Sequence, residues 1–351
     1  MKKWFKLDEN MIGLLSLLVA ICIVFTLLMP GRFFTLQTFG SVASQLPELG
    51  LFTLAMFIPM LSGGFNLCII GTANLTSLLM AWIFISYIPA DASMFFQVIM
   101  LMVAMVAAIL LSIVIGMFTG AMVAYIGAHP ILVTLATMTM VNGIGIELTH
   151  GAALSGMPEL VRLIGSGTIL GIPLPLVIFL LVAVAVALLL EKTKIGKCIY
   201  MSGSNINATY FSGINTHKLL IAIYTISSVL CVFAGLVMMA RFNSARMGYG
   251  DSYLLLTVLA IILGGTDPNG GFGRVFGVVC ALFVLQIIST GLNLLGISPH
   301  FSLGMWGAVL IITLSVKFFK KRWSEKRAVK NSKPLSNNKN NSNNNAHFVG
   351  K

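Results

Sequence analysis

The chain has 351 residues, of which 58% are hydrophobic and only 9% are charged, whereas a soluble domain carries about 25% charged residues. Apolar runs of about 20 residues recur along it, which is long enough to cross a bilayer as helices and excludes the alternating strands of a membrane barrel. The net charge of +12 does not indicate nucleic-acid binding, because the basic residues gather at the two ends and in one loop. We therefore expect an all-α, polytopic protein of the lipid bilayer that binds no nucleic acid.

The first apolar run, Met11 to Met29, has the position of a signal peptide but is longer than the apolar core of one. Asp8 and Glu9 precede it, and no A-x-A cleavage site follows it. We therefore expect an uncleaved first span behind a short cytoplasmic N-terminus, residues 1–10.

Ten spans are predicted, although residues 49–62 and 252–264 are short and each is broken by a glycine pair. Without these two the chain has eight spans, and that count stays open as the alternative. All ten belong to one transmembrane domain, residues 11–319. In chain order they cover 11–29, 49–62, 71–88, 95–125, 130–149, 172–190, 218–240, 252–264, 275–296 and 302–319.

The basic residues indicate how these spans are oriented. With ten spans both ends of the chain lie on one side, and that side receives eighteen of the 22 Lys and Arg residues. Arg32, Arg162, Arg241 and Arg246 remain on the other side. Because positively charged loops stay in the cytoplasm, we expect both termini to be cytoplasmic (N-in and C-in), together with the loop Ser202–Lys218.

The last segment, residues 320–351, contains a basic flank and a tail. The stretch KFFKKRWSEKR, which begins at Lys317, suits contact with anionic lipid headgroups. After about Lys330 the sequence is rich in Asn and has no apolar surface to bury, so we expect this tail to be disordered.

Several kinds of chemistry are missing from the sequence. No Asp, Glu, Lys or Arg is predicted in the middle of a span, whereas ion-coupled carriers place such a group inside the membrane. There is no H-E-x-x-H motif, Ser/His/Asp constellation or metal-ligand spacing. We therefore expect no enzyme activity, metal or cofactor in this chain. The cysteines show no paired spacing and are interpreted as small buried hydrophobes: Cys22, Cys68, Cys198, Cys231 and Cys280.

Gly264–Arg274, with the sequence GGTDPNGGFGR, has the glycine content of a phosphate-binding loop. It lacks the G-K-[ST] that would contact phosphate and Mg²⁺. Residues 267–270 are typical turn residues instead. We interpret the stretch as a tight cytoplasmic turn, so that any energy for pumping must come from another chain.

Ser202–Lys218 interrupts the apolar sequence with the polar segment SGSNINATYFSGINTHK, longer than the usual connection of about 4–6 residues. Asn205 or Asn207 can cap a short helix here, and Gly213 can end it in a left-handed conformation. The spacing alone favours equally a helix that docks on a soluble partner and an inert helix on the lipid surface. The apolar anchors of this helix are Tyr210, Phe211 and Ile214.

Two stretches of the sequence closely resemble the membrane permeases of ribose-type ABC importers, a group that covers pentose, galactose and autoinducer-2 systems. They are GKCIYMSGSNINATYFSGINTHKLLIAIYTISSVLCVFAGLVMMAR and LAIILGGTDPNGGFGRVFGVVCALFVLQIISTGLNLLGI. LSGGFNLCIIG and HPILVTLATMTMVNGI match more loosely, and the resemblance covers about residues 10–318. The residues that carry it are Gly196, Tyr200, Gly203, Asn205, Ala208, Ser212 to Ile214, Lys218, Gly264 to Thr266, Gly270, Gly271, Gly273, Arg274 and the run from Gly291 to Gly296.

This resemblance implies a transporter of several subunits in a bacterial cytoplasmic (inner) membrane. Two permease subunits would form the pathway for a monosaccharide or similar small polyol, an ATPase subunit with its ATP and Mg would supply energy, and an extracytoplasmic sugar-binding protein would deliver the solute. The polar segment would be the coupling helix, with Asn207, Thr209, Ser212, Asn215 and His217 facing the ATPase. The full set of coupling residues is Asn205, Asn207, Ala208, Thr209, Ser212, Gly213, Ile214, Asn215, His217 and Lys218.

The sequence departs from the family pattern after its early glycine pair. Relatives usually carry Ile-Asp-Leu-Ser there, and this chain carries Phe65-Asn66-Leu67-Cys68. The change is either drift at a structural turn, where Asn and Asp are near equivalents, or a sign that the second permease subunit is an unlike chain that keeps the Asp.

A sugar pathway needs hydrogen-bonding groups and aromatic faces in or near the spans. Each Asn there more often joins two helices than contacts a solute, so both roles stay open. The alternative functions are a self-sufficient secondary carrier and a non-transporting membrane scaffold. The candidate pathway residues are Phe65, Asn66, Asn74, Asn142, Asn293 and Phe301.

Overall fold

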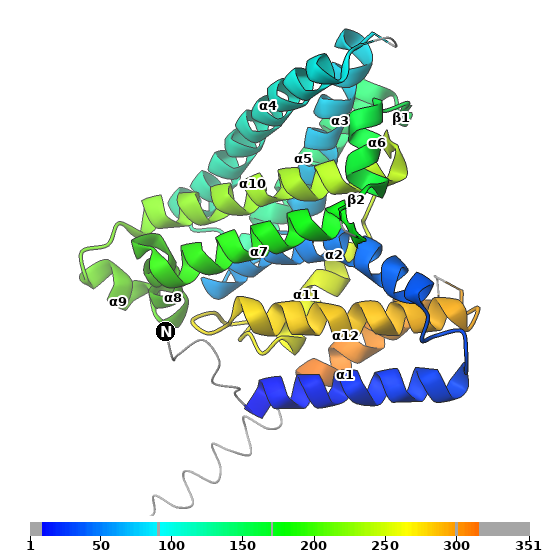
Figure 1. The fold of residues 1–351 in the computed structure, drawn as a ribbon. Helices are drawn as coiled ribbons and strands as arrows, with labels where there is room; N and C mark the ends of the chain where they lie inside the picture. Colours follow the sequence, from blue (N-terminus) through cyan, green and yellow to red (C-terminus); the bar gives the residue numbers. More distant parts are fainter. Residues whose placement is uncertain (1–8, 90–91, 170, 299–300, 316–351) are drawn as a thin grey trace, which may run out of the picture. The chain divides into compact units, whose positions relative to one another are not determined.

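The computed structural model describes residues 9–89, 92–169, 171–298 and 301–315, and these are mostly helical (Figure 1). The chain divides into two compact units, residues 1–307 and 308–351. Residues 1–8 of the predicted N-terminal segment and the tail from 316 onward lie outside the described residues. The helices are α1 (Glu9–Leu28), α2 (Leu36–Leu61), α3 (Ile69–Tyr87), α4 (Met94–Ala121) with the π-helix η1 (Met122–Ile126), α5 (Pro130–Thr149), α6 (Glu159–Ser166), α7 (Leu174–Lys192), α8 (Lys194–Ser204), α9 (Ile206–Phe211), α10 (Thr216–Phe242), α11 (Tyr253–Leu263) and α12 (Val275–Leu294), followed by an unlabelled helix, Phe301–Ser315.

Two small antiparallel sheets add to the predicted all-α architecture. Strand β1 (Leu154–Ser155) pairs with β4 (Ser244–Ala245), with Leu154 opposite Ala245. Strand β2 (Thr168–Ile169) pairs with β3 (Ile172–Pro173). Each strand has two residues, so the sheets fasten connections between helices and do not form a layer of their own.

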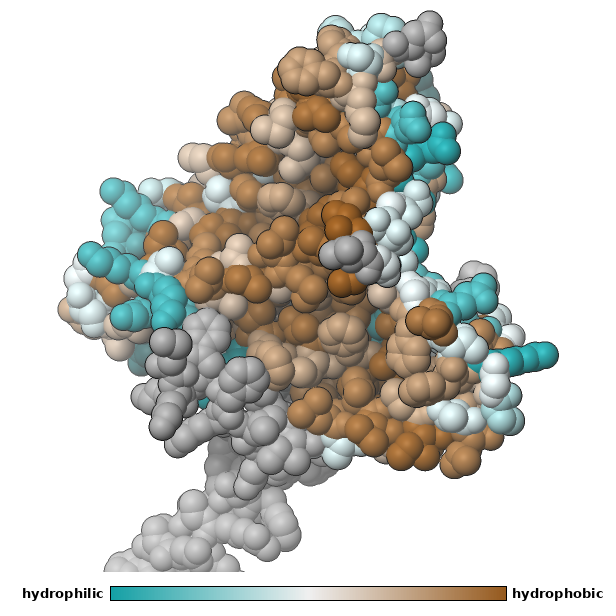
Figure 2. All heavy atoms as spheres, viewed as in Figure 1, coloured by the Kyte–Doolittle hydropathy of each residue, from teal (hydrophilic) through white to brown (hydrophobic). Residues whose placement is uncertain are grey.

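Within the described residues, seven helices are long and apolar enough to cross a membrane: α2, α3, α4 with η1, α5, α7, α10 and α12. Three shorter apolar helices, Gly13–Leu28, α11 and Phe301–Ser315, coincide with the remaining predicted spans. Each of the ten predicted ranges therefore falls on a helix, although the last range runs past the described residues. Figure 2 shows apolar side chains over most of the viewed face and hydrophilic ones gathered at its ends.

Helix α2 is the main difference from the predicted spans. It begins at Leu36, where the hydroxyl of Thr35 accepts a hydrogen bond from the Thr38 amide at 3.2 Å, and not near residue 49. The helix includes residues 36–48, ahead of the predicted range, and continues through Pro47 and Pro59. A helical proline lacks the amide that bonds to the carbonyl four residues earlier. For Pro59 that carbonyl is Ala55 O, which accepts a hydrogen bond from the hydroxyl of Ser227 in α10 at 2.7 Å.

Helix α10 packs against α2, α3 and α4 and forms the centre of the bundle with α2 (Figure 1). Its contact with α4 is close because Gly116 and Gly120 carry no side chain there. A Cβ on Gly116 would lie 2.6 Å from the Cα of Thr225, and one on Gly120 would lie 2.7 Å from the Cα of Ile221. Small residues four apart allow helices in lipid to pack backbone against backbone. This packing holds α10 closely against α4.

Candidate functional site

The polar segment after α8 folds as the sequence predicts. Asn205 caps α9, since its Oδ1 accepts a hydrogen bond from the amide of Ala208 at 3.0 Å. Gly213 follows the helix with a φ of +81°, the left-handed conformation that glycine adopts most readily. Asn215 then caps α10 by accepting from the amide of Lys218 at 3.0 Å. Two asparagine caps and one glycine therefore define a single short helix between two longer ones.

Helix α9 presents a polar and aromatic outer face. Phe211 is 86% exposed and Tyr210 is 61% exposed, and their rings pack against each other edge to face. Asn207 and Ser212 are exposed as well. Thr209, which was expected to face a partner, is 1% exposed and its hydroxyl donates to the carbonyl of Asn205, so it lies on the inner side of the helix.

An open groove of about 310 Å³ runs beside α9. Its walls come from the end of α8 and from α9 with the cap residues at both of its ends. Most of the lining side chains are small or polar, which leaves room for a side chain from another molecule. The lining residues are Tyr200, Met201, Ser204, Asn205, Ala208, Thr209 and Ser212.

The end of α8 also touches the end of α2 and the glycine-rich loop, and this three-way contact is called the glycine junction here. The amide of Gly271 donates to the carbonyl of Leu61 at 2.8 Å. A Cβ on Gly203 would lie 2.0 Å from that carbonyl oxygen and 2.4 Å from the Gly271 nitrogen. Only a residue without a side chain fits between these backbones. Sequence reasoning missed the junction, since it joins segments about 140 and 70 residues apart.

The glycine-rich loop itself is the turn that was predicted. The amide of Gly270 donates to the carbonyl of Asp267 at 3.0 Å, and the Asp267 carboxylate accepts from the amide of Asn269 at 3.0 Å. Tyr200 of α8 donates its hydroxyl to the carbonyl of Gly273 at 2.9 Å. Burial, helped by the nearby Glu191, raises the pKa of Tyr200 to about 12 despite the opposing charge of Arg274, so the phenol stays a donor.

His217 links the polar segment to the end of α4. Its Nδ1 lies 2.7 Å from the carbonyl oxygen of Ala124 in η1, and its ring stacks on that of Tyr125 with centroids 5.1 Å apart. A π-helix displaces carbonyls from the regular hydrogen-bond pattern, and His217 binds one of them. The predicted coupling segment thus contacts the end of α2 through Gly203 and η1 through His217, and its last residues begin α10.

Asn66, a predicted pathway residue, is part of a buried hydrogen-bond chain. Its Nδ2 donates to the hydroxyl of Ser227 at 2.9 Å, and its Oδ1 accepts from the amide of Cys68 at 3.1 Å. Because Ser227 gives its own proton to the carbonyl of Ala55, residue 66 must be a donor. An aspartate could not donate while ionised. The geometry therefore favours a structural role for Asn66, whose hydrogen bonds connect the turn before α3 to α10.

The other predicted pathway residues are not brought together in one place. Asn74 is fully buried and donates to the carbonyl of Tyr249 at 3.0 Å, while Asn142 lies against Gly71 of α3. The side-chain oxygens of both asparagines are buried without a hydrogen-bond partner in the described part of the chain. Phe65 is half-buried, and Asn293 and Phe301 are exposed.

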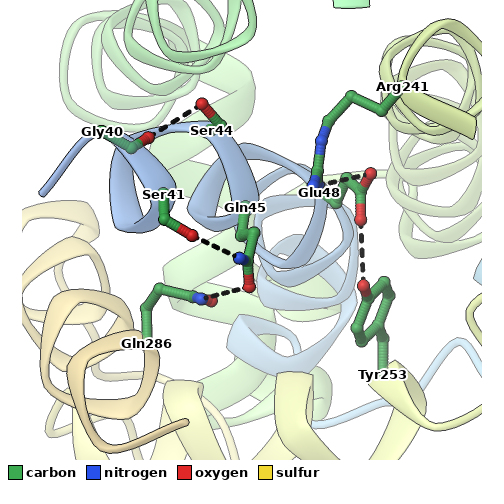
Figure 3. A network of polar contacts seen from close by, with 8 residues as sticks. All are labelled: Gly40, Ser41, Ser44, Gln45, Glu48, Arg241, Tyr253 and Gln286. Atoms are coloured by element: carbon green, nitrogen blue, oxygen red, sulfur yellow. Dashed lines mark hydrogen bonds and ion pairs between the residues drawn. The ribbon is translucent and has the colours of Figure 1, made fainter. Parts of the chain in front are cut away.

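A buried ion pair corrects the prediction that no ionisable group lies in the middle of a span. Glu48 sits near the middle of α2 and is 1% exposed, and its Oε1 lies 2.7 Å from the guanidinium of Arg241 at the end of α10 (Figure 3). Tyr253 of α11 donates to Glu48 Oε2 at 2.9 Å. The predicted span began at residue 49, which left Glu48 just outside it. The full length of α2 puts the carboxylate inside.

Figure 3 shows a second set of polar contacts further along α2, and the two sets together are called the Glu48 network here. Gln45 lies one turn before Glu48, donates to the hydroxyl of Ser41 at 2.8 Å and accepts from the amide of Gln286 in α12 at 3.2 Å. The network therefore joins α2, α10, α11 and α12. Charged groups inside a membrane are costly unless paired and commonly mark functional positions. The Glu48 network is therefore a second candidate region, beside the polar segment and its glycine junction.

The chain is similar to transport proteins over most of its length. The family profile described as "Branched-chain amino acid transport system / permease component" matches residues 38–314. Ribose import permease protein RbsC of Escherichia coli (strain K12) is 32% identical over 319 residues, which cover 90% of this chain and 94% of the relative. Autoinducer 2 import system permease protein LsrD of Photorhabdus temperata is 30% identical over 222 residues, which cover 60% of this chain and 67% of the relative. No solved structure matches the chain significantly.

Proposed function

The chain belongs to the family of transport-system permease components, and from this premise we propose that it is the membrane permease subunit of an ATP-driven ABC importer. The single observation that carries the proposal is the shape of its polar segment. Helix α9 exposes two aromatic rings beside an open groove, and residues on either side of it contact the end of α2 and η1, which continues α4. A soluble subunit bound at this helix can therefore move several membrane helices together.

The ATPase is a separate chain in this proposal and carries ATP and Mg, while this chain has no enzyme activity of its own. Tyr210 and Phe211 fit an apolar pocket on that partner, because exposed aromatic side chains are common anchors of protein interfaces. Two further partners are an extracytoplasmic solute-binding protein and a second permease subunit, alike or unlike. Nucleic acid has no role.

We also propose a topology of ten spans with both termini in the cytoplasm of a bacterium and the chain in its inner membrane. The ten predicted ranges all coincide with helices, and the basic residues are divided eighteen to four between the two sides. A reporter inserted at Ser155 is expected on the outside and one fused after Lys320 in the cytoplasm. Both reporters on the same side would contradict the ten-span arrangement.

The proposed solute is a monosaccharide or a similar small polyol. The names of the relatives support this, since ribose and autoinducer 2 are the solutes they specify, although the family description names branched-chain amino acids. The test is uptake by the reconstituted complex of D-ribose, D-xylose, D-galactose and L-leucine. Uptake of a sugar and not of leucine supports the proposal, and uptake of leucine alone overturns the choice of solute.

The docking role of α9 is tested with Phe211→Ala in the full complex. We expect loss of co-purifying ATPase and at least a tenfold drop in solute-stimulated ATP hydrolysis. Phe95→Ala is the matched control, because Phe95 is also highly exposed, at 75%, but lies at the start of α4. Equal ATPase binding by both variants would show that α9 is not the docking helix.

A further inference from the structure

A partly open cavity of about 70 Å³ lies beside the Glu48 network. About 10–15 Å³ is enough for one water molecule, so the cavity has room for several waters or for part of a small solute. Its walls come from α2, α11 and α12, with one aromatic residue from the helix after α12. The lining residues are Gln45, Leu49, Tyr253, Leu256, Leu285, Gln286, Ser289 and Trp306.

The polar groups of the wall point to a ligand with hydroxyl groups. The Nε2 of Gln286 is 3.2 Å from Gln45 Oε1 and 3.5 Å from the hydroxyl of Thr290, so its protons face these neighbours. No described residue donates a hydrogen bond to the side-chain oxygen of Gln286, so this oxygen can accept one from a ligand hydroxyl. Ser289, one turn along the same face of α12, adds a hydroxyl that can donate or accept.

The wall is held in place by the Glu48 network. Tyr253 donates to the carboxylate of Glu48, which is itself fixed by Arg241, and the Tyr253 ring packs on Phe52 with centroids 6.1 Å apart. Because Glu48 and Phe52 already hold the Tyr253 side chain, ordering this side chain costs no further free energy when a ligand binds. The ion pair therefore serves to position one wall of the cavity.

The charge of the wall selects the class of occupant. None of the lining residues is charged, and the nearby Glu48 and Arg241 neutralise each other. A cation, an anion or a zwitterionic amino acid would lack a partner for its charge in this buried place. Trp306, 4% exposed, offers an aromatic face to the C–H groups of a sugar ring. We propose that this cavity binds a hydroxyl-bearing part of the neutral solute during transport, with Gln286, Ser289 and Tyr253 as its polar contacts.

This inference rests on the proposed import of a sugar-like solute. The test uses the full complex, with permease, ATPase and binding protein, and a Ser289→Cys variant whose new thiol lies in the cavity. Labelling by methyl methanethiosulfonate is followed by intact mass relative to the unaltered chain, with and without a mixture of D-ribose, D-xylose and D-galactose. Leu294→Cys is the control, because Leu294 is on the same helix, 40% exposed and outside the cavity.

We expect the sugar mixture to slow labelling of Ser289→Cys at least fivefold and to leave labelling of Leu294→Cys unchanged. Ser289→Leu, which fills the cavity, is expected to reduce sugar uptake tenfold or more while the amount of assembled complex stays the same. If the unaltered complex imports a sugar but neither effect is seen, the cavity is not a solute site and the proposed function stands. If it imports none of the sugars, the proposed function fails, and the assignment of this cavity fails with it.

Discussion

The two candidate regions of this molecule are built in opposite ways. The glycine junction brings three backbones together, with the carbonyl of Leu61 and the amide of Gly271 in direct contact at a position where Gly203 leaves no side chain between them. The Glu48 network joins its helices through long side chains, and the ion pair and the two glutamines all reach across gaps. Backbone contact transmits a displacement as a unit, whereas side chains can exchange partners. A displacement of the first region is therefore passed on as a block, whereas the second can change one side-chain contact at a time.

Removing one charge of the buried pair is expected to have the largest effect. Glu48→Ala leaves Arg241 without its partner, and breaking a buried ion pair on one side costs about 3–5 kcal/mol of stability. The measurement is thermal unfolding of the purified chain in detergent. Glu147→Ala is the control, since Glu147 is exposed near the end of α5.

The double variant Glu48→Ala with Arg241→Ala sharpens this test. We expect it to lose clearly less stability than the sum of the two single variants, because no charge is left alone. Additive losses would show that the two residues act independently and that the ion pair is not an energetic unit.

Asn66→Asp tests the chain of hydrogen bonds that lies along α2 between the two regions. An ionised aspartate at this position has no proton for Ser227, so either Ser227 turns away from Ala55 or two acceptors face each other. An unsatisfied buried polar group costs about 3 kcal/mol at the upper end of its range. The loss is measured by thermal unfolding, and Asn207→Asp, on the exposed face of α9, is the control.

The same variant separates the two explanations of Asn at position 66. If the chain pairs with an unlike subunit that supplies a carboxylate, Asn66→Asp should raise uptake by a complex that has this chain as its only permease. We expect lower uptake instead, because Asn66 is a structural donor. Higher uptake without loss of stability would favour the unlike pair.

Gly203→Ala tests the glycine junction directly. Its Cβ would meet the carbonyl of Leu61 and the amide of Gly271, both backbone atoms that cannot rotate away. Overpacking of this kind costs about 2 kcal/mol, and we expect ATP hydrolysis to become uncoupled from solute. Gly143→Ala in α5 is the matched control, because nothing lies within 4 Å of its added carbon. Equal behaviour of the two variants would show that the junction is loose.

Sequence reasoning found the polar segment around α9 but neither the glycine junction nor the Glu48 network, for a physical reason. The caps at Asn205 and the stop at Gly213 are local signals that need only neighbouring residues. The Glu48 network depends on where α2 begins, and the predicted span began at residue 49, one residue after Glu48. The partners Arg241 and Tyr253 lie about 200 residues further along the chain, and no periodicity links them to Glu48.

The smallest expected effect belongs to a side-chain hydrogen bond near the glycine junction. Tyr200→Phe removes the hydroxyl that donates to the carbonyl of Gly273 and leaves the ring in place, so we expect a loss of about 1 kcal/mol, the usual net value of one hydrogen bond. The pKa of Tyr200 is raised to about 12 in the fold, so its neutral form is the stabilised one. That stability is fully present below the ordinary tyrosine value of about 10 and is lost only as the pH rises through the folded value. The difference between variant and unaltered chain should therefore stay constant from about pH 6 to about pH 9, measured by thermal unfolding. Tyr210→Phe is the control, because Tyr210 is 61% exposed on α9, and we expect it to leave the stability unchanged. If the stability lost by Tyr200→Phe grew with pH in this range, the phenol of Tyr200 would titrate there and would not be held as a donor.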